Sequence, residues 1–79
     1  MLHEIKIDEP YADAILDGRK TFVVRYNNKG YNAGDKVKFQ VYNGYAPAPH
    51  RLNGCVYNIT YVYSGAGVEN RHVVFGIKA

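Results

Sequence analysis

The residues best suited to chemistry in this 79-residue chain lie in one run, Gly18-Arg19-Lys20-Thr21-Phe22-Val23-Val24-Arg25. It combines three cations and a hydroxyl with apolar and β-branched side chains. Core packing gives no reason for so many cations, whereas recognition of a phosphate or carboxylate does. The run therefore predicts an anion-binding cleft in which Lys20 and Arg25 hold the anion and Arg19 extends the cationic patch.

Each of these residues also has a purely structural interpretation. Arg25 can pair with Asp35 across the mouth of a barrel while Lys20 stays solvated. Thr21 places a hydroxyl beside the cations, but threonine also favours strands, and an activated threonine needs an adjacent base. Both interpretations of the run stay open at this stage.

Aromatic residues supply the second set of candidates, since 8 of the 79 residues are tyrosine. Tyr31 and Tyr45 lie in turn-rich segments near cations such as Arg51, which is typical of sites where exposed rings stack on bases. We expect these two tyrosines to be exposed platforms and Arg51 to be a further binding residue. Tyr57, Tyr61 and Tyr63 share one face of the 54–63 strand. Stacking on bases is one interpretation of that face, but its alternation with Ile59 favours core packing.

Charge is unevenly distributed along the chain. Residues 1–17 carry a net charge of −4 and residues 18–79 a net charge of +7, which gives +3 overall. A basic body with an acidic helical flap favours a polyanionic partner. Charge for solubility alone is the competing explanation.

Cysteine and histidine usage limits the classes of site. Cys55 is the only cysteine, so no intrachain disulfide or cysteine metal cluster forms. His3, His50 and His72 lack metal-ligand spacing, and we expect no metal and no cofactor. No long apolar run indicates a membrane span or signal peptide. We therefore expect one cytoplasmic domain, residues 1–79, that is monomeric and has no membrane partner.

Hydrophobic periodicity predicts mainly β structure with one short helix. Residues 2–7 alternate as a strand, and Asp8 is placed as the N-cap of a helix whose buried stripe is Tyr11, Ala14 and Ile15 and whose end is Gly18. Further strands are expected over 20–26, 36–43, 54–63 and 73–77, with a loop over 43–53. So few elements favour a small α+β pseudo-barrel of about five strands, with the helix after the first strand plugging one end.

Several of these features occur in a recognisable order. A strand and short helix end in Gly18-Arg19-Lys20-Thr21, Arg25 follows five residues after Lys20, and Gly34-Asp35 precedes a strand. This order, with the late segments Ile59–Val62 and His72–Ile77, resembles the ASCH branch of the PUA-like superfamily, nearest to a small bacterial and phage branch of unknown function. The resemblance implies a pseudo-barrel with a cleft beside the helix, and a role in binding RNA or modified nucleotides.

The same resemblance implies an alternative, because some small ASCH proteins are amidohydrolases of acylated cytidine nucleosides. Their lysine corresponds to Lys20, and Glu69 is the only acid after Asp35 that can serve as their glutamate. Their hydroxyl residue, three positions after the lysine, is Val23 in this chain, so binding ranks ahead of hydrolysis. Whether the protein is an enzyme stays open, and so does the choice among RNA, DNA and a modified nucleoside as its ligand. A third hypothesis is that the protein binds a host protein.

Overall fold

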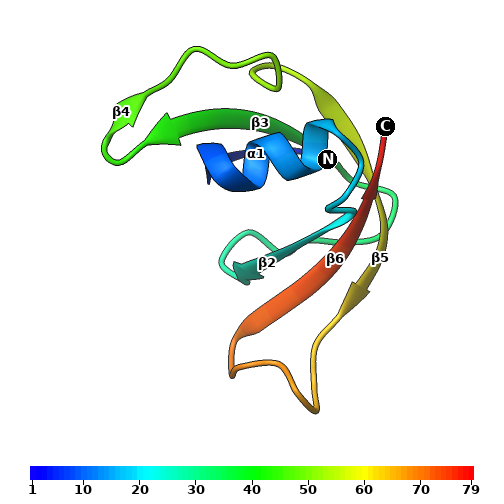
Figure 1. Cartoon of the computed structure of the whole chain (residues 1–79). Helices are drawn as coiled ribbons and strands as arrows, with labels where there is room; N and C mark the ends of the chain where they lie inside the picture. The colour runs from blue at the N-terminus through cyan, green and yellow to red at the C-terminus, as the bar shows by residue number, and fades with distance from the viewer.

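The computed structural model describes all of residues 1–79 and shows a curled, half-open barrel with one helix (Figure 1). The elements are, in order, β1 (Leu2–Asp8), α1 (Glu9–Leu16), β2 (Phe22–Tyr26), β3 (Lys36–Asn43), β4 (Ala46–Pro47), β5 (Val56–Tyr63) and β6 (His72–Lys78). The predicted mainly β fold with a short helix after the first strand is confirmed. The expected loop over 43–53 was wrong in one detail, because the short strand β4 pairs with β3 inside it.

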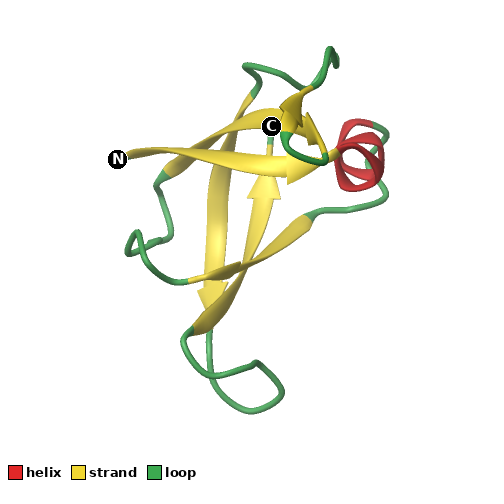
Figure 2. Ribbon diagram, turned by 90° about the vertical axis from the view of Figure 1, so that its left-hand side faces the viewer, coloured by secondary structure: helices red, strands yellow, loops and turns green.

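The sheet has two end strands that do not pair with each other. Its order is β1-β3-β5-β6-β2, with β1 and β3 parallel and the other neighbours antiparallel. The curl brings β1 and β2 to face each other, but no backbone ladder joins them, so the barrel keeps an open seam. Helix α1 packs against β1 and β3 and lies beside their ends (Figure 2).

Strand alternation fills the core as the sequence predicts. One face of β1 contributes Ile5 and Ile7, and the facing residues of β3 and β6 include the fully buried Phe39 and Phe75. The predicted helical stripe was partly wrong: Ala12 and Ile15 are the buried positions, whereas Tyr11 is more than half exposed. Because α1 covers only the end of the sheet, its Tyr11 side lies over the seam rather than in the core.

A β-bulge changes which tyrosines face the core. The register between β5 and β6 shifts between Ile59 and Tyr61, so Thr60 is the extra residue. Ile59 is buried, but after the bulge Val62 packs against the core while Tyr61 and Tyr63 face outward. The prediction that Tyr61 and Tyr63 are core residues was therefore wrong, because an extra residue exchanges the two faces of a strand.

A polar cluster closes the barrel near the start of β1. Buried His3 places its Nε2 2.9 Å from Asp35 Oδ2, and the amino group of Met1 lies 3.2 Å from Asp35 Oδ1. The hydrogen bond with His3, followed by the bond from the amino group of Met1, lowers the pKa of Asp35. The alternative interpretation that Asp35 pairs with Arg25 was wrong. Separately, no helix is long and apolar enough to cross a membrane.

Candidate functional site

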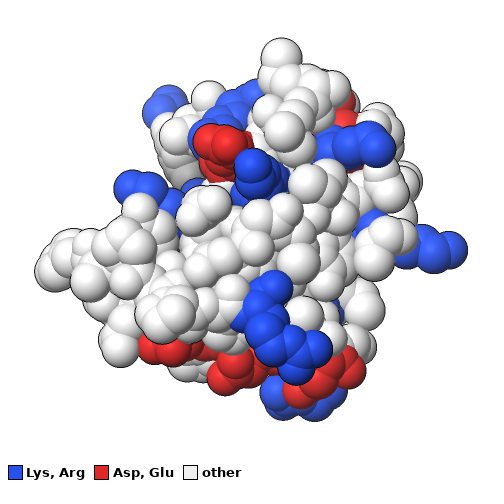
Figure 3. Space-filling model, turned by 90° about the horizontal axis from the view of Figure 1, so that it is seen from above, with Lys and Arg blue, Asp and Glu red and all other residues white.

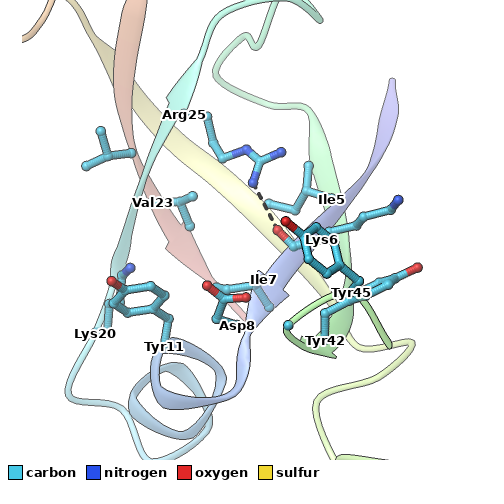
Figure 4. A pocket seen from close by; sticks show the side chains of 12 residues that line it. Ile5, Lys6, Ile7, Asp8, Tyr11, Lys20, Val23, Arg25, Tyr42 and Tyr45 are labelled. Carbon is cyan, nitrogen blue, oxygen red and sulfur yellow. Dashed lines mark hydrogen bonds between the residues drawn. The ribbon is translucent and has the colours of Figure 1, made fainter. Parts of the chain in front are cut away.

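A cleft of about 620 Å³ occupies the open seam between β1 and β2 (Figure 4). Strand β1 supplies one wall, β2 supplies the opposite wall, and the turn after β3 overhangs the rim. The lining residues are Ile5, Lys6, Ile7, Asp8, Tyr11, Lys20, Val23, Val24, Arg25, Tyr42, Gly44 and Tyr45. Two of the cations that the sequence singled out, Lys20 and Arg25, therefore do share one cavity.

Arg25 spans the seam. Its Nη1 donates a hydrogen bond of 2.9 Å to the backbone oxygen of Lys6, and Lys29 Nζ donates to the backbone oxygen of Glu4. These carbonyls lie on the edge of β1 that has no strand partner. Two cationic side chains therefore donate the hydrogen bonds that a neighbouring strand would otherwise donate to them. The guanidinium has five N–H donors, and the bond to Lys6 uses only one of its nitrogens, which leaves donors for an anion in the cleft.

Lys20 reaches the cleft because the chain turns sharply after α1. Gly18 adopts φ +85°, which ends the helix as predicted, and the Lys20 N–H donates to the Ala14 carbonyl at 3.0 Å. The Lys20 ammonium lies 4.4 Å from the centre of the Tyr11 ring and forms no ion pair. Partial burial lowers the pKa of Lys20. A desolvated cation with only aromatic partners is well placed to accept an anion.

Asp8 lines the cleft, which the sequence analysis did not predict. We expected its carboxylate to cap α1, yet Asp8 makes no side-chain cap hydrogen bond. Its carboxylate instead points into the cleft (Figure 4). The signal was Pro10 in the first turn of the helix, because proline lacks one of the two N–H groups to which an N-cap side chain normally bonds.

Aromatic rings line the cleft beside these charges. Tyr11 and Tyr42 border it, and Lys6 Nζ lies 5.1 Å from the centre of the Tyr42 ring. Tyr45 follows Gly44 in the turn between β3 and β4 and is fully exposed, as expected of a platform. Neither Tyr11 nor Tyr42 was among the predicted site residues; the strand and helix patterns alone do not indicate which ends meet at the seam.

Four other predicted residues lie outside this cleft. Arg19 pairs with Asp17 at 2.7 Å, and that hydrogen bond lowers the pKa of Asp17. Thr21 is exposed before β2, and Arg51 is exposed in the loop after β4. Glu69 lies in a separate hollow with His72, so the structure does not bring Glu69 to Lys20.

Tyr31 is not the exposed platform that we predicted. Its side chain is 4% exposed and packs between His3 and Phe75, with ring centres 4.8 Å apart in both pairs. Its hydroxyl is buried without a hydrogen-bond partner. The Tyr31 N–H donates to Asn27 Oδ1 at 3.4 Å, so the turn before it is tied to the backbone of this buried residue.

The face of the molecule seen from above is mixed in charge rather than uniformly basic (Figure 3). Viewed from above, most of the acidic groups lie along one border, and the lysines and arginines are scattered between uncharged areas (Figure 3). A continuous basic track for a long duplex is not present on this face.

Comparison with protein families gives a match over almost the whole chain. A family model described as "Domain of unknown function (DUF3850)" matches residues 2–77. No curated protein matches the chain.

Proposed function

The chain belongs to the DUF3850 family, and on the geometry of its open seam we propose that it binds RNA or a nucleotide in the cleft between β1 and β2. The observation that carries this proposal is the meeting of Lys20 and Arg25 with three tyrosines in one cavity. Kinship with the ASCH branch of the PUA-like superfamily is part of the same proposal.

The cationic wall is suited to phosphate. Arg25 is held in place by its bond to the Lys6 carbonyl, so part of the entropy cost of ordering it is met before a ligand arrives. Lys20 provides a second donor at the opposite end of β2. Its ammonium forms no ion pair, so no carboxylate competes with a phosphate for it. A phosphate between them replaces the hydration that both groups lose on burial.

The opposite wall is suited to a base. Tyr42 and Tyr45 present rings beside the cleft, and a nucleobase stacked on an aromatic ring contributes about 1–3 kcal/mol. The Asp8 carboxylate accepts hydrogen bonds only, so it favours bases with an exocyclic amine over uracil. A nucleotide that carries cytosine therefore satisfies both the cationic and the acidic groups of the cleft.

The direct test is an amide chemical-shift titration of isotope-labelled protein with a short mixed-sequence single-stranded RNA. We expect shifts concentrated in 5–8, 20–25 and 42–45. If Lys6, Lys20 and Arg25 each neutralise one phosphate, log affinity should fall against log salt with a slope of about −2. Absence of shifts at low salt, or a slope near zero, contradicts the proposal. Arg51→Ala, outside the cleft, is the matched control and should leave the affinity nearly unchanged.

Hydrolysis of an acylated nucleoside is the second candidate, because one observation favours it. Burial lowers the pKa of Lys20, and the Asp8 carboxylate lies in the same cleft, where Glu69 does not. An amine of lowered pKa and a carboxylate are the parts that general acid–base chemistry needs. Incubation with N4-acetylcytidine tests this candidate: release of acetate that is lost in both Lys20→Ala and Asp8→Asn supports it, and no release contradicts it.

A further inference from the structure

The outer face of β2, β6 and β5 carries exposed aromatic residues in register. Phe22 of β2 and Tyr61 of β5 both lie opposite Gly76 of β6, and Tyr63 lies opposite Val74. Phe22 is 46% exposed and Tyr61 69% exposed. The three strands (Figure 1) contain no aspartate or glutamate, whereas Lys78 occupies the same face of β6 as Gly76. An aromatic face without carboxylates is compatible with an anionic chain.

Gly76 has no side chain of its own between Phe22 and Tyr61, and we call the strip of surface over Gly76 the slot. Phe22 and Tyr61 stand one strand to either side of it, roughly 10 Å apart at the backbone. A planar base stacked between two rings needs roughly 7 Å, twice the stacking distance of bases. A side chain at Gly76 has no room, since its Cβ would lie 2.5 Å from Thr60 Oγ1. Thr60, the bulge residue, thus places a hydroxyl at the floor of the slot.

Lys20 connects this slot to the cleft. Its ammonium lies 4.4 Å from the centre of the Tyr11 ring, which borders the cleft, and 5.4 Å from the centre of the Phe22 ring, which borders the slot. A single cation therefore contacts an aromatic wall of each site. A phosphate bound at Lys20 would therefore lie between the cleft and the slot.

We infer that the ligand is a single-stranded oligonucleotide that crosses the edge of β2 at Lys20, with one base in the cleft and the next stacked over Gly76 between Phe22 and Tyr61. This inference rests on the proposed function and deepens it. A single strand suits the site because its bases are free to separate and stack on protein rings. A free nucleotide fills only the cleft.

The test compares cytidine monophosphate with a single-stranded tetranucleotide of cytidines, by titration calorimetry and by the ring-proton shifts of Phe22 and Tyr61. The tetranucleotide should bind roughly 10- to 100-fold more tightly, the gain expected of one or two stacked bases. Phe22→Ala and Tyr61→Ala should each remove most of that gain. Tyr61→Ala, which does not touch Lys20, should also leave the affinity for the monophosphate unchanged, whereas Phe22→Ala also removes a ring from beside Lys20. Both residues are exposed, so the variants should fold. Val56→Ala, an exposed position elsewhere on β5, is the matched control.

The outcomes separate this inference from the proposed function. If neither ligand binds, the proposed function fails and this inference with it. Equal affinity for both ligands, or a tetranucleotide gain that survives in the two alanine variants, overturns the inference alone. Self-association is a further contrary outcome. If sedimentation shows a dimer that depends on Tyr61 and that the tetranucleotide does not dissociate, this face binds a second copy of the chain and the inference is overturned.

Discussion

The two edges of β1 differ, and the difference locates the site. One edge pairs with β3 along the whole strand, from Leu2 opposite Lys36 to Asp8 opposite Tyr42. The other edge pairs with no strand and is met only by the side chains of Arg25 and Lys29. An edge strand normally invites another chain to pair with it. Here cations satisfy part of that edge and leave a cleft in which a ligand can bind.

The two sides also differ in what they contribute. Behind the paired edge lies the apolar core, in which Val37 and Phe39 are fully buried. Along the open edge, cationic, acidic and aromatic side chains stand beside apolar ones and line a cleft. Stability should therefore depend on the first side and ligand affinity on the second, so that mutations on the two sides should have separable effects.

The largest expected effect comes from breaking the paired side. Phe39→Ala removes a ring from the centre of the core and should lower the free energy of unfolding by about 3–5 kcal/mol. Urea unfolding followed by circular dichroism measures this change. For a domain of this size, such a loss leaves a partly unfolded population at room temperature. A loss below about 1 kcal/mol would show that the barrel does not depend on its packed half.

The next effect comes from the open side. Arg25→Ala should weaken the proposed RNA binding roughly 10- to 100-fold, since a hydrogen bond to a charged group contributes about 1.5–3 kcal/mol. Arg25→Lys keeps the charge but loses the planar guanidinium, whose several N–H groups can contact the Lys6 carbonyl and an anion at once. Its affinity should therefore lie between those of Arg25→Ala and the unmodified protein. Calorimetric titration with the RNA checks both variants. If Arg25→Ala binds as the unmodified protein does, Arg25 only closes the seam.

A smaller effect should appear as pH dependence. Because burial lowers the pKa of Lys20, its ammonium deprotonates at lower pH than an ordinary lysine, and phosphate affinity should fall up to about tenfold as the pH rises through that pKa. The pH dependence of stability has the opposite sign. The folded state holds the Lys20 proton less tightly than the unfolded state, so the free energy of unfolding rises with pH between the folded and unfolded pKa values of Lys20.

Titrations and thermal unfolding from pH 7 to about pH 10.4, the ordinary lysine value, measure both trends. Lys20→Met should remove both of them, whereas Lys38→Met on the outer side of β3 should not. Identical pH profiles in Lys20→Met and the unmodified protein would contradict the assignment of Lys20 as the titrating group.

The smallest effect is expected at Tyr31. Its hydroxyl is buried without a partner, so Tyr31→Phe removes an unsatisfied polar atom and should stabilise the protein by up to about 1 kcal/mol without changing RNA affinity. Thermal unfolding and the same titration test both parts. A loss of affinity would instead mean that Tyr31 becomes exposed when the ligand binds.

Much of the fold could be predicted because its signals are local. The strand predicted over 36–43 matches β3, and Gly18 ends the helix with a positive φ. Period-two alternation identified the buried residues of β1 and β3, as expected where one strand face meets a core. These features depend only on neighbours within a few residues.

Less of the site could be predicted, because its parts come from separate segments. Lys20 and Arg25 were predicted because they stand in one run, and Tyr45 because it is a turn residue; the structure places all three in the lining of the cleft. Asp8, Tyr11 and Tyr42 were missed because only the curl of the sheet brings the ends of β1, α1 and β3 to one cavity. Tyr31 was misplaced for the same reason, since turn composition does not tell which way a ring points.

The sequence by itself therefore determined the elements, the core faces of the early strands and the cationic run at the start of β2. The tertiary structure decided the rest: β1 and β2 end the sheet without pairing, Arg25 bridges them, and the bulge at Thr60 turns Tyr61 outward. The physical reason is that periodicity and turn chemistry act over a few residues, whereas strand order and register depend on contacts between residues that are far apart in the chain.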